Sequence, residues 1–178
     1  MTPQNPKERV ISLAKKFVEG NALIIDTETT GLDEEAEIVE IAIIDAAATF
    51  EFVAMIKPAR PIPERVTQIH GITNAMVEPM PSAAMLWPVV RSVIADRHLL
   101  AYNSSFDAQM MEQSFGLEAF REWDCLMHMI LTFEGLAWRG IKLDIVCSKL
   151  GIEAGGHRAL PDAKAAREVL RWLARQEV

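Results

Sequence analysis

Acidic side chains stand at three places in the sequence where they could bind a hard divalent cation. Asp26 and Glu28 follow the short apolar run Ala22–Ile25 and are two residues apart, so on an extended chain both carboxylates point to the same face. Two adjacent anions at the edge of an apolar core repel each other unless a cation lies between them. Because Mg²⁺ and Mn²⁺ prefer oxygen ligands, the pair predicts a metal site, although an Asp-x-Glu taken alone is more often a turn cap beside a solvated acid.

Two further segments supply carboxylates and an imidazole. Asp107 follows the run His98–Tyr102, just past the carboxyl end of a second expected strand, where open α/β sheets bind ligands. As a lone residue it would be an acid that stabilises a helix N-terminus. Asp162 lies in the first turn of the last expected helix, after Pro161. His157 precedes it in a glycine-containing loop that we interpret as mobile, and an imidazole near a fourth acid suits a general base, whereas a lone loop histidine is usually just solvated.

These residues are positioned by segments that carry strand and helix patterns. Strands are predicted for 22–25, as the buried central strand, for 38–45, for 49–57 with one covered face, and for 98–102, with 46–48 as a hairpin link. Helices are predicted for 6–20 after an Asn5 cap, 82–96, 107–115, 125–133, 143–150 and 161–176, and the proline-rich stretch 58–81 predicts a surface loop with one or two helical turns. The class is α/β with a partly antiparallel sheet and helices on both faces.

The composition predicts one globular domain over residues 1–178, with residues 1–20 as an N-terminal helical extension. Half of the 178 residues are apolar and 24% are charged, which excludes a disordered chain. The net charge of −7 argues against a broad basic nucleic-acid surface, and no Lys/Arg cluster is dense enough to predict a basic patch. Two cysteines are too few for a disulfide framework and favour the reducing cytoplasm, and no signal peptide or membrane segment is predicted.

The motifs together resemble those of a known enzyme family. Asp26-x-Glu28 followed by Thr-Thr-Gly, Asn103-x-x-Phe106-Asp107 and His157-x-x-x-x-Asp162 resemble the three exonuclease motifs of the histidine-bearing (DEDDh) branch of the DEDD superfamily. The proofreading epsilon subunit of bacterial DNA polymerase III and RNase T belong to that branch. The resemblance runs from about Ala22 to Ala174, and the segments 69–73 and 123–127 are similar to the loop after the third strand and to the helix-entry segment of epsilon-like exonucleases.

The resemblance implies an RNase H-like fold with a five-stranded mixed sheet flanked by helices. It also implies 3′→5′ removal of nucleoside monophosphates from nucleic-acid ends with two Mg²⁺ or Mn²⁺ ions. Asp26 would bridge both ions, Glu28 and Asp162 would complete the first site, Asp107 would hold the second ion partly through water, and His157 would take the proton of the attacking water. Thr29 and Leu32 would contact the terminal nucleotide, and His70 and Phe106 would line the same pocket. Thr29 and Phe106 have an ordinary turn and core role as the alternative.

The expected substrates are single-stranded or frayed 3′ ends, with DNA preferred, and a polymerase or another recruiting protein is a candidate partner. The chain ends sixteen residues after Asp162, so we expect a catalytic module without a polymerase-binding tail. Two divalent cations would bring the formal charge of the four-acid site from −4 to about zero. This predicts weak, metal-dependent binding of nucleic acid, or a partner protein that strengthens the binding. The alternatives are an exoribonuclease acting on short RNA or RNA 3′ tails and a catalytically silent nucleic-acid-binding module.

Overall fold

A five-stranded mixed sheet runs through the middle of the molecule in the order β3-β2-β1-β4-β5. The computed structural model describes residues 5–116, 123–137 and 140–177. β1 pairs antiparallel with β2 and β2 with β3, whereas β1, β4 and β5 are parallel. β1 is therefore the central strand, as predicted. The strands are β1 Leu23–Thr29, β2 Ile38–Asp45, β3 Glu51–Met55, β4 Leu99–Ala101 and β5 Trp123–Cys125.

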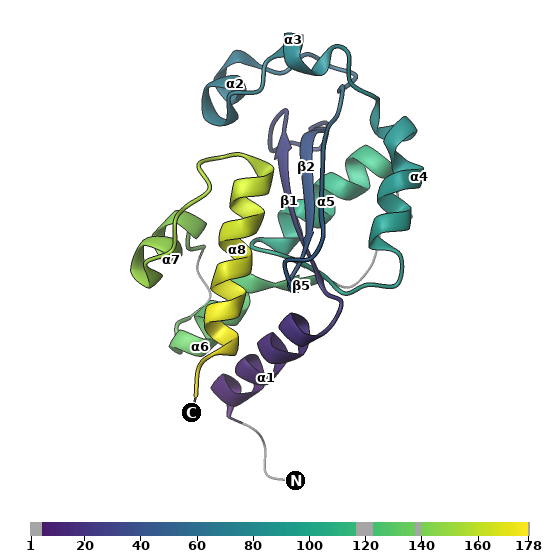
Figure 1. The fold of residues 1–178 in the computed structure, drawn as a ribbon. Helices are drawn as coiled ribbons and strands as arrows, with labels where there is room; N and C mark the ends of the chain where they lie inside the picture. The colour runs from purple at the N-terminus through teal and green to yellow at the C-terminus, as the bar shows by residue number, and fades with distance from the viewer. Residues whose placement is uncertain (1–4, 117–122, 138–139, 178) are drawn as a thin grey trace.

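Helices cover both faces of this sheet and one of its ends (Figure 1). α1, α6, α7 and α8 enclose one apolar core, α4 and α5 enclose the other, and α2 and α3 lie across the end of β1 and β2. The mixed α/β architecture and the five strands that the resemblance implied are confirmed. The helices are α1 Pro6–Glu19, α2 Glu64–His70, α3 Asn74–Val77, α4 Ala83–Ile94, α5 Ser104–Phe115, α6 Leu126–Glu134, α7 Leu143–Leu150 and α8 Ala159–Ala174.

The central strands are apolar on both faces because both faces are covered. On β1, Ile24 packs into the core beneath α8, and Ile25 packs into the core beneath α5. All eight residues of β2 are buried, and its side chains alternate between the two cores in the same way. This double burial fixes the register of β1 against β2, because a slip of one residue would send every side chain to the wrong core.

A β-bulge interrupts the pairing of β1 and β2 beside the candidate acids. Glu28 lies opposite Glu40 and Thr29 lies opposite Ile38, so Val39 is an extra residue on β2. Val39 is fully buried and packs with residues of the 62–77 segment. The bulge therefore supplies an apolar anchor that holds α2 and α3 over the carboxyl end of β1.

Several predicted boundaries are wrong, and strand pairing explains two of them. The helix predicted for 107–115, for example, is α5 and begins at Ser104. The central strand does not stop at residue 25 but continues to Thr29, because β2 satisfies its backbone groups beyond the apolar run. Residues 123–125 form β5 beside β4, so Cys125 ends a strand and does not begin a helix. α8 begins at Ala159, two residues before the predicted start at Pro161.

Other sequence predictions are confirmed within the described ranges. Asn5 caps α1 in a capping box with Glu8, and the stretch 58–81 contains two short helices. Among the described residues, no helix combines the length and apolar character that crossing a membrane requires. The first four residues of the predicted N-terminal extension lie outside the described ranges.

Candidate active site

Three of the four predicted carboxylates converge at the carboxyl end of β1. Asp26 and Glu28 project from β1 on the face that α8 covers, and Asp162 lies in the first turn of α8. One oxygen from each lies within 4.8 Å of the others, and all three residues are half-buried. The alternation of the strand and the position of the helix start together bring residues 26 and 162 to one point.

The fourth carboxylate approaches β1 from the opposite helical layer. Asp107 is buried in the first turn of α5, which starts just after β4 ends. Its Oδ1 accepts a hydrogen bond of 2.9 Å from the hydroxyl of Thr27, the residue between the two acids of β1. Among the charges that raise the pKa of Asp26, that of Asp107 has the largest effect, so Asp107 lies within electrostatic reach of Asp26.

Burial and mutual repulsion make these carboxylates reluctant to ionise. Burial, and then the charges of Asp107 and Asp162, raise the pKa of Asp26 well above its usual range. Burial followed by repulsion from Asp162 raises the pKa of Glu28 to about 8. Burial raises the pKa of Asp107 to about 7, despite the opposing hydrogen bond from Thr27. Burial also raises the pKa of Asp162, against backbone N–H groups that favour its charge.

This donor set fits divalent metal ions. Four carboxylates supply only oxygen atoms, which Mg²⁺ and Mn²⁺ prefer over the softer ligands that zinc and copper favour. A bound cation would remove the repulsion that raises these pKa values. The residues present therefore fit the ions that the sequence motifs implied.

The predicted base is held beside Asp162 by a tight loop. His157 is exposed, and its backbone adopts a left-handed conformation with φ 59°, which is uncommon for a residue other than glycine. The N–H of Arg158 donates to Oδ2 of Asp162 at 3.0 Å. The charge of His157 lowers the pKa of both Asp162 and His70, so the imidazole lies within electrostatic reach of both residues.

Gly155 is a point of close contact and not only a source of flexibility. A Cβ built at this position would lie 2.3 Å from the backbone nitrogen of Asp162 and 2.5 Å from its Oδ1. No side chain fits in that space. The loop that we interpreted as mobile therefore packs its glycine against the first turn of α8.

An ion pair between a buried carboxylate and a partly exposed guanidinium anchors this loop to the sheet. Glu40, only 3% exposed on β2, accepts hydrogen bonds from Arg158 Nε at 3.0 Å and Nη2 at 2.5 Å, and from the N–H of Ala159 at 3.0 Å. Burial raises the pKa of Glu40, but these donors outweigh it, and the net shift is downward. Glu40 also lies opposite Glu28 in the sheet. The ion pair of Glu40 with Arg158 therefore fixes the His157 loop to β2, beside the strand that carries Asp26 and Glu28.

The four residues that the resemblance places near a nucleotide differ in their burial and in their contacts. Leu32 is 81% exposed, whereas Thr29 is buried with its hydroxyl donating to the Gly31 carbonyl at 2.6 Å. His70 is buried, with Nδ1 accepting from the N–H of Ile72 at 3.0 Å and Nε2 3.3 Å from the Thr29 carbonyl oxygen. Phe106 is half-buried and packs against the core beneath α5.

Sequence reasoning missed the residues that support the acids. Glu40 is a single charge inside an apolar strand and reads as an interruption of that strand, and Arg158 reads as a solvated loop residue. Thr27 lies between two acids without a motif of its own. A buried charge in a strand with both faces covered requires a partner, and that is the signal that could have singled out Glu40.

Comparisons with known proteins agree with the motifs and with the geometry. A sequence model of the RNase T family, described as exonuclease, matches residues 23–170. Exonuclease CP81 of Escherichia phage 186, described as uncharacterized, is 32% identical over 91% of this chain and 92% of its own length. DNA polymerase III subunit epsilon of Aquifex aeolicus is 27% identical, over 89% and 83%. The structure of exonuclease X in complex with 5′ overhanging duplex DNA has a TM-score of 0.67 at 28% identity, covering 88% of this chain and 94% of that one.

Without metal, the raised pKa values of the acid cluster predict that the protein loses stability as the pH rises. Carboxyls whose folded pKa lies above the unfolded value of about 4 stabilise the fold only while protonated, and this contribution is lost as the pH rises through about 7 to 8 for Asp107 and Glu28. In EDTA at pH 8, Asp26→Asn should unfold about 3–5 °C above wild type, because removing one charge lessens the repulsion in the cluster. This shift corresponds to ~1.4 kcal/mol in the free energy of unfolding, the equivalent of one pKa unit. Mn²⁺ should stabilise wild type more than the variant, and more at pH 8 than at pH 6. Thermal unfolding checks this, and equal melting temperatures in EDTA would contradict it.

The anchoring role of Glu40 predicts a loss of stability when its charge is removed. Glu40→Gln leaves the Arg158 guanidinium without its carboxylate, and because the Arg158 side chain is 40% exposed we expect a loss of only about 1–2 kcal/mol in urea unfolding. The matched control is Glu35→Gln, which breaks the ion pair of Glu35 with Arg60 between two largely exposed side chains. Its unfolding midpoint should stay at the wild-type value. If both variants behaved alike, the anchoring role would be wrong.

Proposed function

Because the chain belongs to the RNase T family of exonucleases, we propose that it removes nucleoside monophosphates from the 3′ ends of nucleic-acid strands, with DNA as the preferred substrate. The observation that carries this proposal is the convergence of Asp26, Glu28 and Asp162 within 4.8 Å, with Asp107 reaching Asp26 from the other layer. Four oxygen donors at the carboxyl end of a central strand suit the two-metal hydrolysis of a phosphodiester.

Asp26, Glu28, Asp107 and Asp162 would hold two divalent ions, with Asp26 shared between them. When bound, such ions neutralise the phosphodiester and lower the pKa of the attacking water. The proximity of Asp26 to Glu28 and Asp162 and the effect of the Asp107 charge on its pKa support its role as the shared ligand. Thr27 orients the Asp107 carboxylate through its 2.9 Å hydrogen bond.

His157 would accept the proton of the water that attacks the terminal phosphorus. The bond from phosphorus to the 3′ oxygen of the preceding nucleotide then breaks, and a nucleoside 5′-monophosphate leaves the shortened strand. The exposed imidazole next to Asp162, held on a left-handed backbone by the anchored residues that follow it, supports this role. Strained backbone at a site is retained when the surrounding structure fixes it, as Glu40 does here.

Four residues would position the terminal nucleotide. The exposed Leu32 side chain offers an apolar contact to a base or sugar, and Phe106 offers a second one from α5. Thr29 and His70 would act through the backbone between them, since the His70 ring lies 3.3 Å from the Thr29 carbonyl oxygen. DNA preference is supported by two similar proteins, an exonuclease whose structure contains duplex DNA and a DNA polymerase subunit. A recruiting protein, with a polymerase as one candidate, would strengthen the binding of nucleic acid by this chain, whose net charge is −7.

A labelled-strand assay tests the direction and the substrate. With 5′-labelled single strands and Mg²⁺ or Mn²⁺, we expect a ladder that shortens from the 3′ end, release of nucleoside monophosphates, and faster degradation of DNA than of RNA of the same sequence. EDTA and Asp26→Asn should each abolish the ladder. Immediate release of the labelled 5′ nucleotide would show degradation from the 5′ end and contradict the proposed direction. Cleavage of RNA alone would overturn the DNA preference. Binding without cleavage would favour a catalytically silent nucleic-acid-binding module.

The proposed base makes a separate prediction. His157→Ala should lower the rate by roughly 10²–10⁴, the usual contribution of a positioned acid–base group, while Mn²⁺ still raises the melting temperature as in wild type. The matched control is His98→Ala, at the amino end of β4 and in ring contact with Phe17. It should retain the wild-type rate. An unchanged rate for His157→Ala would assign the proton to another acceptor.

A further inference from the structure

Arg158, the residue after the proposed base, uses only one edge of its guanidinium group. Its Nε donates to Glu40 at 3.0 Å, and its Nη2 donates to the same carboxylate at 2.5 Å. Within the described residues, Nη1 donates to no acceptor, and it is not among the buried polar atoms that lack a partner. Because the Arg158 side chain is 40% exposed, Nη1 faces solvent with two unused N–H donors.

The ion pair holds this guanidinium beside the acid cluster. Glu40 lies opposite Glu28 in the sheet, so the two side chains project from the same face, the one that α8 covers. The backbone N–H of Arg158 also donates to Oδ2 of Asp162 at 3.0 Å. Arg158 is therefore fixed on two sides at the strand end where the acids converge.

The same guanidinium lies within electrostatic reach of a residue assigned to the terminal nucleotide. Burial lowers the pKa of His70, and the charge of Arg158 adds to that effect. Burial raises the pKa of Glu28, and the charge of Arg158 opposes that rise. His70 Nε2 is in turn 3.3 Å from the carbonyl oxygen of Thr29. Arg158 thus lies near both an acid of the cluster and the proposed nucleotide pocket.

The unused edge suits an oxygen acceptor that arrives with a ligand. Among the described residues, Glu40 is the only acceptor of side-chain hydrogen bonds from Arg158, although the Glu28 carboxyl is within electrostatic reach. Glu40 balances the charge of the guanidinium and fixes the orientation of its planar fork, so little conformational freedom is left to lose on binding. A nucleotide offers oxygen acceptors on its phosphate and on its sugar.

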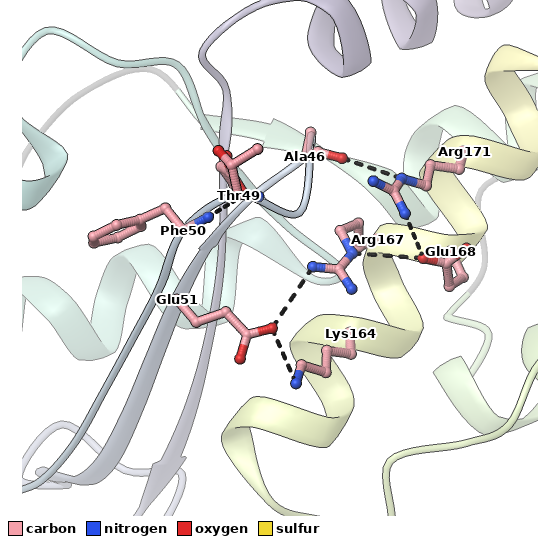
Figure 2. A network of polar contacts seen from close by, with 9 residues as sticks. Ala46, Thr49, Phe50, Glu51, Lys164, Arg167, Glu168 and Arg171 are labelled. Carbon is pink, nitrogen blue, oxygen red and sulfur yellow. Dashed lines mark hydrogen bonds and ion pairs between the residues drawn. The ribbon is translucent and has the colours of Figure 1, made fainter.

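The cations farther along α8 lack this arrangement. Arg171 Nε donates to the Ala46 carbonyl at 3.2 Å, and Lys164 Nζ is 3.0 Å from the Glu51 carboxylate (Figure 2). Both partners belong to the hairpin of β2 and β3, which lies at the amino end of β1, whereas the acids lie at its carboxyl end. These cations therefore provide a matched comparison on the same helix.

We propose that Arg158 is a substrate-contact residue, whose Nη1 donates a hydrogen bond to an oxygen of the 3′-terminal nucleotide, on its phosphate or on its sugar. The inference rests on the proposed exonuclease function and adds a residue to its substrate contacts. Glu40 then has two effects, since it fixes the loop of the proposed base and orients the donor edge of Arg158.

The test measures binding of the reaction product and does not depend on cleavage. In Mn²⁺, Arg158→Gln should raise the Kd for thymidine 5′-monophosphate, measured by NMR titration, about tenfold, the usual effect of losing one charged hydrogen bond. Two analogues identify the acceptor. The difference between wild type and variant should vanish with thymidine if the acceptor is on the phosphate, and with 2′,3′-dideoxythymidine 5′-monophosphate if it is the 3′ oxygen. A difference that persists with both analogues would overturn the contact.

Two control variants separate a contact from an effect on folding. Glu40→Gln breaks the ion pair but keeps Nη1, so it should bind the nucleotide more tightly than Arg158→Gln does. Arg171→Gln removes a guanidinium from the other end of the helix and should bind as wild type does. If Arg158→Gln does not fold, Arg158→Lys takes its place, because an ammonium held by Glu40 has no second planar edge.

The proposal fails if the Arg158 variant binds the nucleotide as wild type does, or if Glu40→Gln or Arg171→Gln weakens binding to the same extent. A wild-type protein that shortened no labelled strand would refute the exonuclease function. Nucleotide binding would still decide the role of Arg158, so the two failures are distinguishable.

Discussion

Repulsion among four carboxylates is the constraint on which the rest of this structure depends. Burial raises the pKa values of Asp26, Glu28, Asp107 and Asp162, and repulsion from neighbouring acids adds to this effect at Asp26 and Glu28, so the fold holds the four together against their electrostatic preference. The stabilisation comes from the apolar cores on both sides of β1 and β2. A bound cation would neutralise the repulsion among the carboxylates, and the same crowding would then give the site its affinity for the cation.

The elements that meet at this point come from distant parts of the chain, and polar contacts secure each of them. Thr27 holds Asp107, the N–H of Arg158 holds Asp162, and Glu40 holds Arg158. These contacts link β1, β2, α5 and α8 in one connected set. The β-bulge at Val39 adds the cover formed by α2 and α3, so the carboxyl end of the sheet is fixed on every side that the structure describes.

The acids were predictable from the sequence because local rules determine where they lie. The supporting residues were not predictable, because their roles depend on contacts between segments that are distant in the sequence. Alternation along an extended chain places Asp26 and Glu28 on one face, and Pro161 marks a helix start near Asp162. Strand β5 was missed because three residues containing an Asp show no apolar period, and only pairing with β4 makes them a strand. Glu40 and Arg158 are 118 positions apart, and the partner of Lys164 is on β3, so no window of sequence contains either pair.

Gly155 carries no functional group, yet its position restricts the chain more than that of many charged residues. A Cβ there would overlap the backbone of Asp162, so every other amino acid would displace the start of α8 or the turn that leads to His157. In evolutionary terms, residue 155 is restricted to glycine by the space around it and not by any chemistry of its own. Inactivating variants of this protein should therefore include changes that leave every acid and the imidazole in place.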